Sequence, residues 1–398
     1  MAVGGDVGVD LGNAFAGGVI DEDDYLLLAD VADVQYVGAA GGVGHGGYRA
    51  RWGDFDFDLW SDQECWVDCR FRKADVLRIC GMLGLGDEVI LPRPDYIHCS
   101  TVELFCLVCR RLAFPCRYVD LLPKFGRSLP YLCKMFNFML SHLYNRYYWL
   151  LRSFEQPWLS GRNLSYFAER INTKGAPLDN CWGFVDGTVR GIARPQQDQR
   201  LFYNGHKRKH ALKYQAVNAP NGLIANFYGP IEGARHDSYL LRQSGLLGDL
   251  QRYSFGENGQ LLCIYGDGGY PFSAHLQTGH RDPANAAQQQ YNARMSSCRV
   301  TVEWAFGMVI EKFKFTDHKA MQKSGLSPLA KQYAVSAILS NMSTCLYGNN
   351  TTNYFECQPP TLAEYLLPQP AQQQPVQQQQ QQPAAGDDDD DDDEDDDE

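Results

Sequence analysis

Three acidic residues in the second half of the chain stand beside apolar segments in a pattern that suits metal chemistry. Asp186 and Asp267 each end a short apolar run, 181–185 and 261–265, and each is followed by glycine, which lets the backbone turn. Glu303 lies in an apolar helical stretch, where an unpaired acid is costly to bury. Hard divalent cations prefer carboxylate oxygens, and two such ions can promote phosphoryl transfer. The three acids therefore predict a metal-dependent phosphoryl-transfer site.

Each acid also has an ordinary structural interpretation. An Asp-Gly-Thr turn after a strand, as at Asp186, is common, and Gly-Asp-Gly-Gly around Asp267 could be loop chemistry alone. Glu303 could pair with Arg299, which precedes it by four residues on the same helix face. Taken singly, the structural interpretations are stronger. The joint order of the acids and the types of element that carry them favour a shared site.

Basic residues near the first acid suit a polyanion. Lys207, Arg208 and Lys209 follow Phe202 and Tyr203, and cations beside aromatic residues can hold a DNA backbone. A short basic loop would by itself be an ordinary solvated surface. Next to three carboxylates that predict a phosphoryl-transfer site, the basic loop favours DNA as the bound polyanion.

The segment before these motifs reads as helical. Its expected helices are 71–85, 101–112, 117–125 and 129–147. The last two are joined by a short turn containing Gly126, with Ser128 as the expected N-cap, which indicates a helix-turn-helix. Lys124, Arg127 and Lys134 could contact phosphates there. A plain helical bundle is nearly as well supported.

After residue 181 the expected elements change in kind. A strand at 181–185 is followed by a hairpin, 210–218 with 223–228, and a helix at 236–246. The strand at 261–265 and helices at 295–313 and 327–345 complete the series. This order predicts an α/β fold in which helices pack on a mixed sheet.

Composition divides the chain into four parts. We expect a poorly ordered glycine-rich leader at 1–55, a helical domain at 56–175, the α/β domain at 176–350 and a disordered Pro/Gln-rich and acidic tail at 358–398. The net charge of -12 comes from the tail, whose last twelve residues are all acidic. A solubilising tail is favoured over one that competes with DNA.

Thirteen cysteines, scattered through apolar segments, indicate free thiols in a reducing compartment. No secretory signal and no membrane-spanning stretch is expected. Cys106 and Cys109 have C-x-x-C spacing without a second such pair, so buried thiols are favoured over a zinc site.

Four motifs in order resemble the Harbinger-type transposases and their domesticated nuclease relatives. The motifs are Phe184-Val185-Asp186-Gly187-Thr188, Gly233-Ala234-Arg235-His236-Asp237-Ser238, Tyr265-Gly266-Asp267-Gly268-Gly269-Tyr270-Pro271, and Tyr291-Asn292 with Arg299-Val300-Thr301-Val302-Glu303-Trp304-Ala305-Phe306-Gly307. The resemblance covers about residues 71–345 and is most specific from 186 to 307. The spacing of Asp267 and Glu303 is typical of DDE transposases.

The resemblance implies an RNase H-like nuclease domain preceded by a helix-turn-helix-like domain. It implies a DNA endonuclease or transposase with Mg²⁺ or Mn²⁺, as a two-metal site, held by Asp186, Asp267 and Glu303. Asp237 is a fourth candidate ligand, although an aspartate at a helix N-terminus can simply stabilise the helix dipole. The implied partners are DNA and a separate Myb-like DNA-binding protein. We also expect a homo-oligomer and, from the substrate, a nuclear location.

Two alternatives remain open. The chain could be a domesticated DNA-binding protein that is catalytically silent. An actin-like ATPase or sugar kinase is suggested only by Val7-Gly8-Val9-Asp10-Leu11-Gly12, and no adjoining hairpin supports it. The polar segment 281–290, with three consecutive glutamines, is expected to form a specialised loop before the helix of Glu303.

Overall fold

The computed structural model describes residues 52–91 and 96–367. The predicted leader therefore lies almost wholly outside the described residues, as do the glycine motif at 7–12 and the tail from residue 368 onwards. The described residues up to Leu366 belong to one compact unit. In this part of the chain, no helix has the length and apolar character that crossing a membrane requires.

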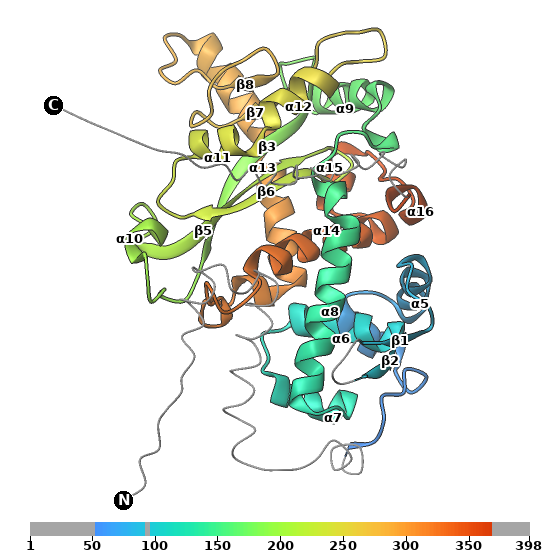
Figure 1. Cartoon of the computed structure of the whole chain (residues 1–398). Coiled ribbons are helices and arrows are strands. Elements are labelled where there is room, and N and C mark those ends of the chain that lie inside the picture. The colour runs from blue at the N-terminus through green and yellow to red at the C-terminus, as the bar shows by residue number, and fades with distance from the viewer. Residues whose placement is uncertain (1–51, 92–95, 368–398) are drawn as a thin grey trace, which may run out of the picture. The chain divides into compact units, whose positions relative to one another are not determined.

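The first half of the described chain is mainly helical. Its elements are α4 (Asp62–Cys69), α5 (Lys73–Met82), β1 (Glu88–Ile90), β2 (His98–Ser100), α6 (Thr101–Ala113), η1 (Tyr118–Leu121), α7 (Leu122–Phe125), α8 (Leu129–Tyr147), η2 (Tyr148–Leu151), η3 (Pro157–Leu159) and α9 (Gly161–Thr173). The expected helices at 101–112 and 129–147 are confirmed as α6 and α8, and Ser128 is the N-cap residue of α8. Helix α8 packs against α6 and against α14 (Leu329–Tyr347) (Figure 1).

The second half builds a mixed sheet. Its strands are β3 (Cys181–Gly191), β4 (Tyr203–Asn204), β5 (Lys209–Asn218), β6 (Ile224–Glu232), β7 (Cys263–Gly266) and β8 (Leu276–Thr278). Strands β3, β5 and β6 form an antiparallel meander because β5 pairs with both of its neighbours. Strand β7 joins the other edge of β3 in parallel, and β8 extends the sheet in parallel with β7. The short β4 pairs with the start of β5.

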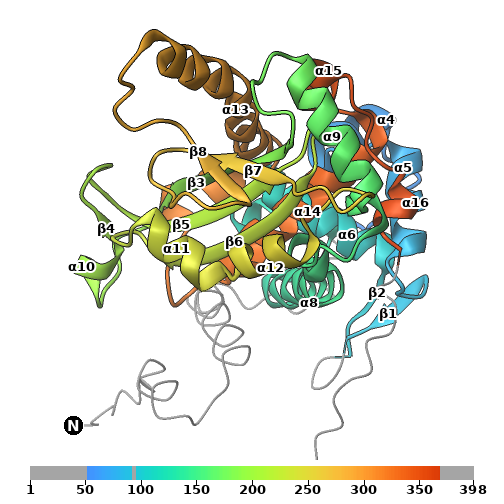
Figure 2. The same ribbon diagram turned by 90° about the horizontal axis from the view of Figure 1, so that it is seen from above.

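Helices cover both faces of this sheet (Figure 2). Successive residues of β5 point to opposite faces, as a pleated strand requires. Lys213 and Gln215 contact α11 (Asp237–Ser244), whereas Tyr214 stacks on Tyr333 of α14. Helix α12 (Leu246–Tyr253) follows α11, and α13 (Ala286–Lys312) contacts β3, β5 and β7. The predicted mixed α/β architecture with flanking helices is thus observed.

Two predicted boundaries near the acids were wrong. Strand β3 continues past residue 185 to Gly191, because each of its residues from Phe184 onwards pairs with β5, so Asp186 lies within a strand. Helix α13 begins at Ala286, where Asn285 caps it by accepting a hydrogen bond from the Gln288 amide. The second half of the polar segment 281–290 is therefore helical.

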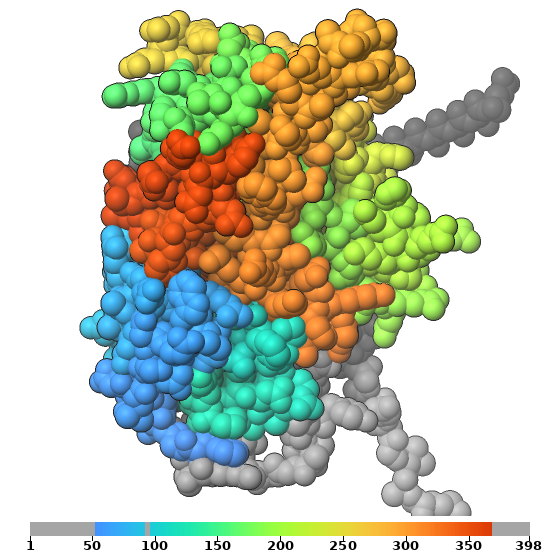
Figure 3. Space-filling model, turned by 180° about the vertical axis from the view of Figure 1, so that it is seen from behind, coloured from blue at the N-terminus to red at the C-terminus, as the bar shows by residue number. Residues whose placement is uncertain are grey.

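The packed chain reaches beyond the predicted start of the tail. Helices α15 (Asn350–Phe355) and α16 (Leu362–Tyr365) follow α14, and Leu362 and Tyr365 are buried. Figure 3 shows these C-terminal segments, in red, beside the N-terminal helices, in blue. One core cluster runs through both halves, so the boundary expected at residues 175 and 176 falls inside a shared core. All thirteen cysteines are free and all but Cys345 are buried, which confirms the predicted free thiols.

Candidate active site

The sheet brings Asp186 and Asp267 to neighbouring positions. Phe184 of β3 pairs with Tyr265 of β7 in parallel register. Each aspartate follows its member of that pair by two residues, and adjacent strands lie about 4.8 Å apart. The two aspartates therefore lie next to each other on neighbouring strands. Asp186 lies within β3, and Asp267 lies just past the end of β7.

Helix α13 adds the third acid through an arginine. Arg299 places one guanidinium nitrogen 3.2 Å from Asp186 Oδ2 and the other 3.6 Å from Glu303 Oε1. The structural interpretation of Glu303 as a partner of Arg299 is thus confirmed. The same arginine also connects Glu303 to the sheet. The Glu303 side chain is 57% exposed, so its carboxylate remains open to solvent.

Burial raises the pKa of Asp186 from 3.8 to about 6. Arg299 and the Gly187 amide, which donates to Asp186 Oδ1 at 2.9 Å, oppose the shift. The charges of Asp267 and Glu303 raise the pKa of Asp186 further. The three acids thus act on one another electrostatically, and their combined negative charge favours a cation in their midst.

The fourth acid lies over the residue that follows Asp186. Asp237 begins α11, and its Oδ1 accepts a hydrogen bond of 3.0 Å from Lys213 Nζ of β5. Gly187 makes room for it, because a Cβ atom there would lie only 3.0 Å from Asp237 Oδ1. Lys213 had not been predicted as part of the site. A lysine in the middle of a predicted strand was its signal, since a buried ammonium needs a partner.

Tyr270 was also missed. It follows Asp267 by three residues, and its side chain is buried among the site acids. Its hydroxyl has no hydrogen-bond partner among the described residues. Burial raises the pKa of Tyr270 well above its ordinary value, and the charges of Asp237, Asp186 and Asp267 raise it further. Nothing local in the sequence shows this placement, which depends on the packing of the loop against the sheet.

The donor chemistry of the site fits a hard divalent cation. Asp186, Asp237, Asp267 and Glu303 supply only carboxylate oxygens, which Mg²⁺ and Mn²⁺ prefer. Among the residues that the structure describes, however, no three His, Cys, Asp or Glu side chains converge closely enough to hold a metal ion. Arg299 supplies positive charge between Asp186 and Glu303 instead. The four acids lie in one region of the sheet, but their carboxylates would have to move closer together to bind an ion.

The basic residues predicted beside the first acid lie at the far end of β3. Lys207 and Arg208 are exposed in the turn before β5, and Lys209 begins that strand. Gly191 of β3 pairs with Ala211, five residues along the strand from Asp186, or about 17 Å at about 3.3 Å per residue. These cations therefore lie away from the carboxylates, along the same strand pair.

The predicted cations of the helical half have partners inside the protein. Lys124 pairs with Asp68 and lies over the Trp60 ring. Arg127 is 8% exposed and donates from two nitrogens to Glu103, each at 2.7 Å. Lys134 is partly buried on α8. Phosphate binding by these three residues stays a prediction.

A further cation lies beside Asp267. Arg281 is exposed and donates a hydrogen bond of 3.1 Å to the Gly268 carbonyl, in the turn that follows Asp267. The sequence placed Arg281 only in a polar segment and gave no sign that the segment folds back onto this turn.

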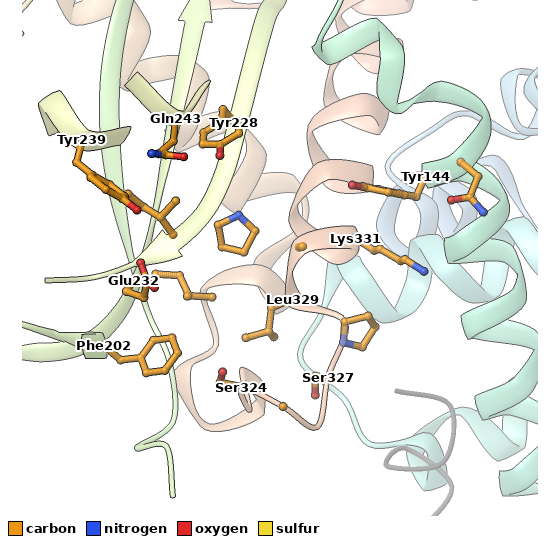
Figure 4. Close-up of a pocket in the computed structure, with 17 residues that line it drawn as sticks. Tyr144, Phe202, Tyr228, Glu232, Tyr239, Gln243, Ser324, Ser327, Leu329 and Lys331 are labelled. Carbon is orange, nitrogen blue, oxygen red and sulfur yellow. The ribbon is translucent and has the colours of Figure 1, made fainter. Parts of the chain in front are cut away.

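A cavity of about 730 Å³ opens elsewhere, where β6 and α11 face the start of α14 (Figure 4). Its lining is mixed, with Tyr228 and Tyr239 facing Leu329 and Lys331. None of the four site acids lines it. The cavity is therefore separate from the carboxylate site.

A family model matches the part of the chain that contains the site acids. Residues 185–341 match a family model described as DDE superfamily endonuclease. No curated protein and no solved structure matches the chain. The matched range contains the four acids together with Lys213, Tyr270, Arg281 and Arg299. The match supports a transposase-derived nuclease domain in this part of the chain.

Proposed function

We propose that this chain is a divalent-metal-dependent DNA endonuclease of the Harbinger transposase type, with an RNase H-like nuclease domain. The observation that carries the proposal is that the pairing of β3 with β7 brings Asp186 and Asp267 next to each other. Arg299 contacts both Asp186 and Glu303 and so connects the third acid to them. The mixed sheet and the family match over residues 185–341 support it.

Asp186, Asp267 and Glu303 would hold Mg²⁺ or Mn²⁺, with Asp237 as a fourth ligand. Such ions, when bound as a pair, activate a water molecule and stabilise the leaving oxygen of a phosphodiester. Arg299 holds Asp186 and Glu303 near each other and limits their repulsion. The exposed Glu303 carboxylate is accessible to a substrate, whereas Asp186 is half-buried and lies deeper in the site.

DNA is the substrate that the surrounding charges favour. Arg281 beside the Asp267 turn, and Lys207 and Arg208 at the far end of the strand pair, are exposed and can meet backbone phosphates. A Myb-like DNA-binding partner, a homo-oligomer and a nuclear location belong to the same proposal, through the resemblance to Harbinger-type proteins.

Nicking of supercoiled plasmid by the purified chain tests the proposal. Wild type should nick in Mn²⁺ and not in EDTA, and Glu303→Gln should reduce nicking to background. Glu311→Gln is the matched control, because Glu311 is an exposed acid two turns further along α13. It should nick like wild type.

Other outcomes separate the alternatives. A wild-type chain that binds DNA but never nicks would favour the catalytically silent DNA-binding protein. Equal nicking by wild type and Glu303→Gln would overturn the assignment of the site.

A further inference from the structure

Tyr270 is held between the backbones of the two strands that carry Asp186 and Asp267. A Cβ atom on Gly266 would lie 2.9 Å from Cδ2 of the Tyr270 ring, so the ring rests on the residue before Asp267. A Cβ atom on Gly187 would lie 3.7 Å from the Tyr270 hydroxyl, so the hydroxyl lies over the residue after Asp186. The contact at Gly266 leaves no space for a side chain, so this placement of the ring depends on that glycine.

The Tyr270 hydroxyl is buried without a hydrogen-bond partner in the part of the chain that the structure describes. Burying a polar group without a hydrogen-bond partner is destabilising. Nearby carboxylates already accept other donors: Asp186 accepts from the Gly187 amide, and Asp237 from Lys213. A hydroxyl donor is thus present among acids that do not use it in this arrangement.

Asp237 is the acid best placed to use it. A Cβ atom on Gly187 would approach both Asp237 Oδ1, at 3.0 Å, and the Tyr270 hydroxyl, so the two groups share the space over this glycine. Lys213, whose side chain is 10% exposed, already holds Asp237 from β5. A second donor from the Asp267 loop would fix the carboxylate from another direction.

Resting on the proposed metal-dependent function, we propose that Tyr270 is a positioning residue for the metal site. With a divalent ion bound, the Tyr270 hydroxyl would donate a hydrogen bond to the Asp237 carboxylate. This bond would orient the carboxylate towards the ion. Outer donors of this kind fix the carboxylates that bind a metal, and their loss typically lowers metal affinity about 10–100-fold. The hydroxyl is therefore unpaired without metal and paired with it.

This role separates metal binding from folding. Tyr270→Phe removes only the hydroxyl and keeps the ring on Gly266. Without metal, the variant loses no hydrogen bond, so its melting temperature in EDTA should equal or exceed that of wild type. Its affinity for Mn²⁺, measured by calorimetric titration and by the rise in melting temperature, should fall about 10–100-fold.

Tyr365→Phe is the matched control with the opposite pattern. The Tyr365 side chain is buried, but its hydroxyl accepts a hydrogen bond of 3.0 Å from Asn341 Nδ2. Losing this bond should lower the melting temperature in EDTA by about 1–2 °C, because a single hydrogen bond is a small part of the unfolding entropy of a unit this large. Its affinity for Mn²⁺ should match that of wild type.

Three results would count against the inference. A Tyr270→Phe variant that melts lower in EDTA, as Tyr365→Phe does, would show that the hydroxyl has a structural partner. Unchanged Mn²⁺ affinity in Tyr270→Phe, with wild type binding normally, would overturn the positioning role and leave the proposed nuclease intact. If wild type binds no Mn²⁺, the proposed function fails and the inference fails with it.

Discussion

The acids of the helical half and the acids of the sheet differ in how completely they are partnered. Glu103 on α6 is 3% exposed, and both of its carboxylate oxygens accept hydrogen bonds of 2.7 Å from Arg127. Asp68 pairs with both Arg110 and Lys124. In the site on the sheet, Glu303 is largely exposed, and its carboxylate lies 3.6 Å from an Arg299 nitrogen. Asp186 contacts the same arginine.

The difference separates structural acids from acids held ready for a ligand. A buried carboxylate that accepts hydrogen bonds from two nitrogens of one guanidinium has its charge neutralised. Such a carboxylate has a structural role and needs no ligand. At the site on the sheet, Arg299 contacts Asp186 and Glu303, Lys213 contacts Asp237, and the Tyr270 hydroxyl has no hydrogen-bond partner among the described residues. Shifted pKa values and unmatched groups of this kind are typical of functional sites.

The largest effect should come from breaking the ion pair of Arg127 and Glu103. Arg127→Met removes the guanidinium that holds both oxygens of the buried Glu103 carboxylate, so the free energy of unfolding should fall by about 3–5 kcal/mol. Glu303→Gln should change it by less than about 1 kcal/mol, because the side chain is exposed. Urea denaturation of both variants checks the comparison. Equal midpoints for the two would show that the two groups of acids do not differ as described.

The next effect concerns the pH dependence of the metal-free protein. The pKa of Asp186 is higher in the folded state, at about 6, than the ordinary 3.8. The folded state therefore holds this proton more tightly, and stability falls as the pH rises from 3.8 to about 6. The loss approaches about 3 kcal/mol above that range. Asp186→Asn should remove it.

Urea midpoints in EDTA at several pH values measure this effect. Asp186→Asn should be more stable than wild type at pH 7 and should show a flatter pH profile between pH 4 and 6. If the variant shows the same pH dependence of stability as wild type, a group other than Asp186 is titrating in this range.

A smaller effect distinguishes the exposed cations from the partnered ones. Lys207→Ala and Arg208→Ala should change stability by less than about 0.5 kcal/mol. If they contact phosphates, each should reduce the salt dependence of DNA binding by about one unit of slope. Lys124→Ala, which among the described residues leaves Asp68 paired with Arg110 only, should lower stability and leave the salt slope unchanged. A reduced slope for Lys124→Ala would instead support the predicted helix-turn-helix contact.

The sequence was sufficient where local patterns decide the structure. Helices α6 and α8 lie where apolar periodicity placed them, and the hairpin of β5 and β6 surrounds the predicted turn. Asp186, Asp267 and Glu303 could be singled out because an acid at a strand end or in an apolar helix contradicts its surroundings. Asp237 could be named only through the resemblance.

Contacts between distant segments could not be predicted in this way. Strand β3 runs on past Asp186 because β5 pairs with it, which the apolar run at 181–185 does not show. Helix α16 is too short to show a period, and its burial depends on contacts such as that of Tyr365 with Asn341. Tyr270 likewise joins the acids only through the packing of its loop.

Calorimetric titration of Mn²⁺ into the purified chain tests the central claim most directly. Wild type should bind about one to two ions per chain. The double variant Asp186→Asn, Asp267→Asn should bind none while melting in EDTA at or above the wild-type temperature. Equal binding by the two proteins, or no binding by wild type, would contradict the assignment of these acids to a metal site.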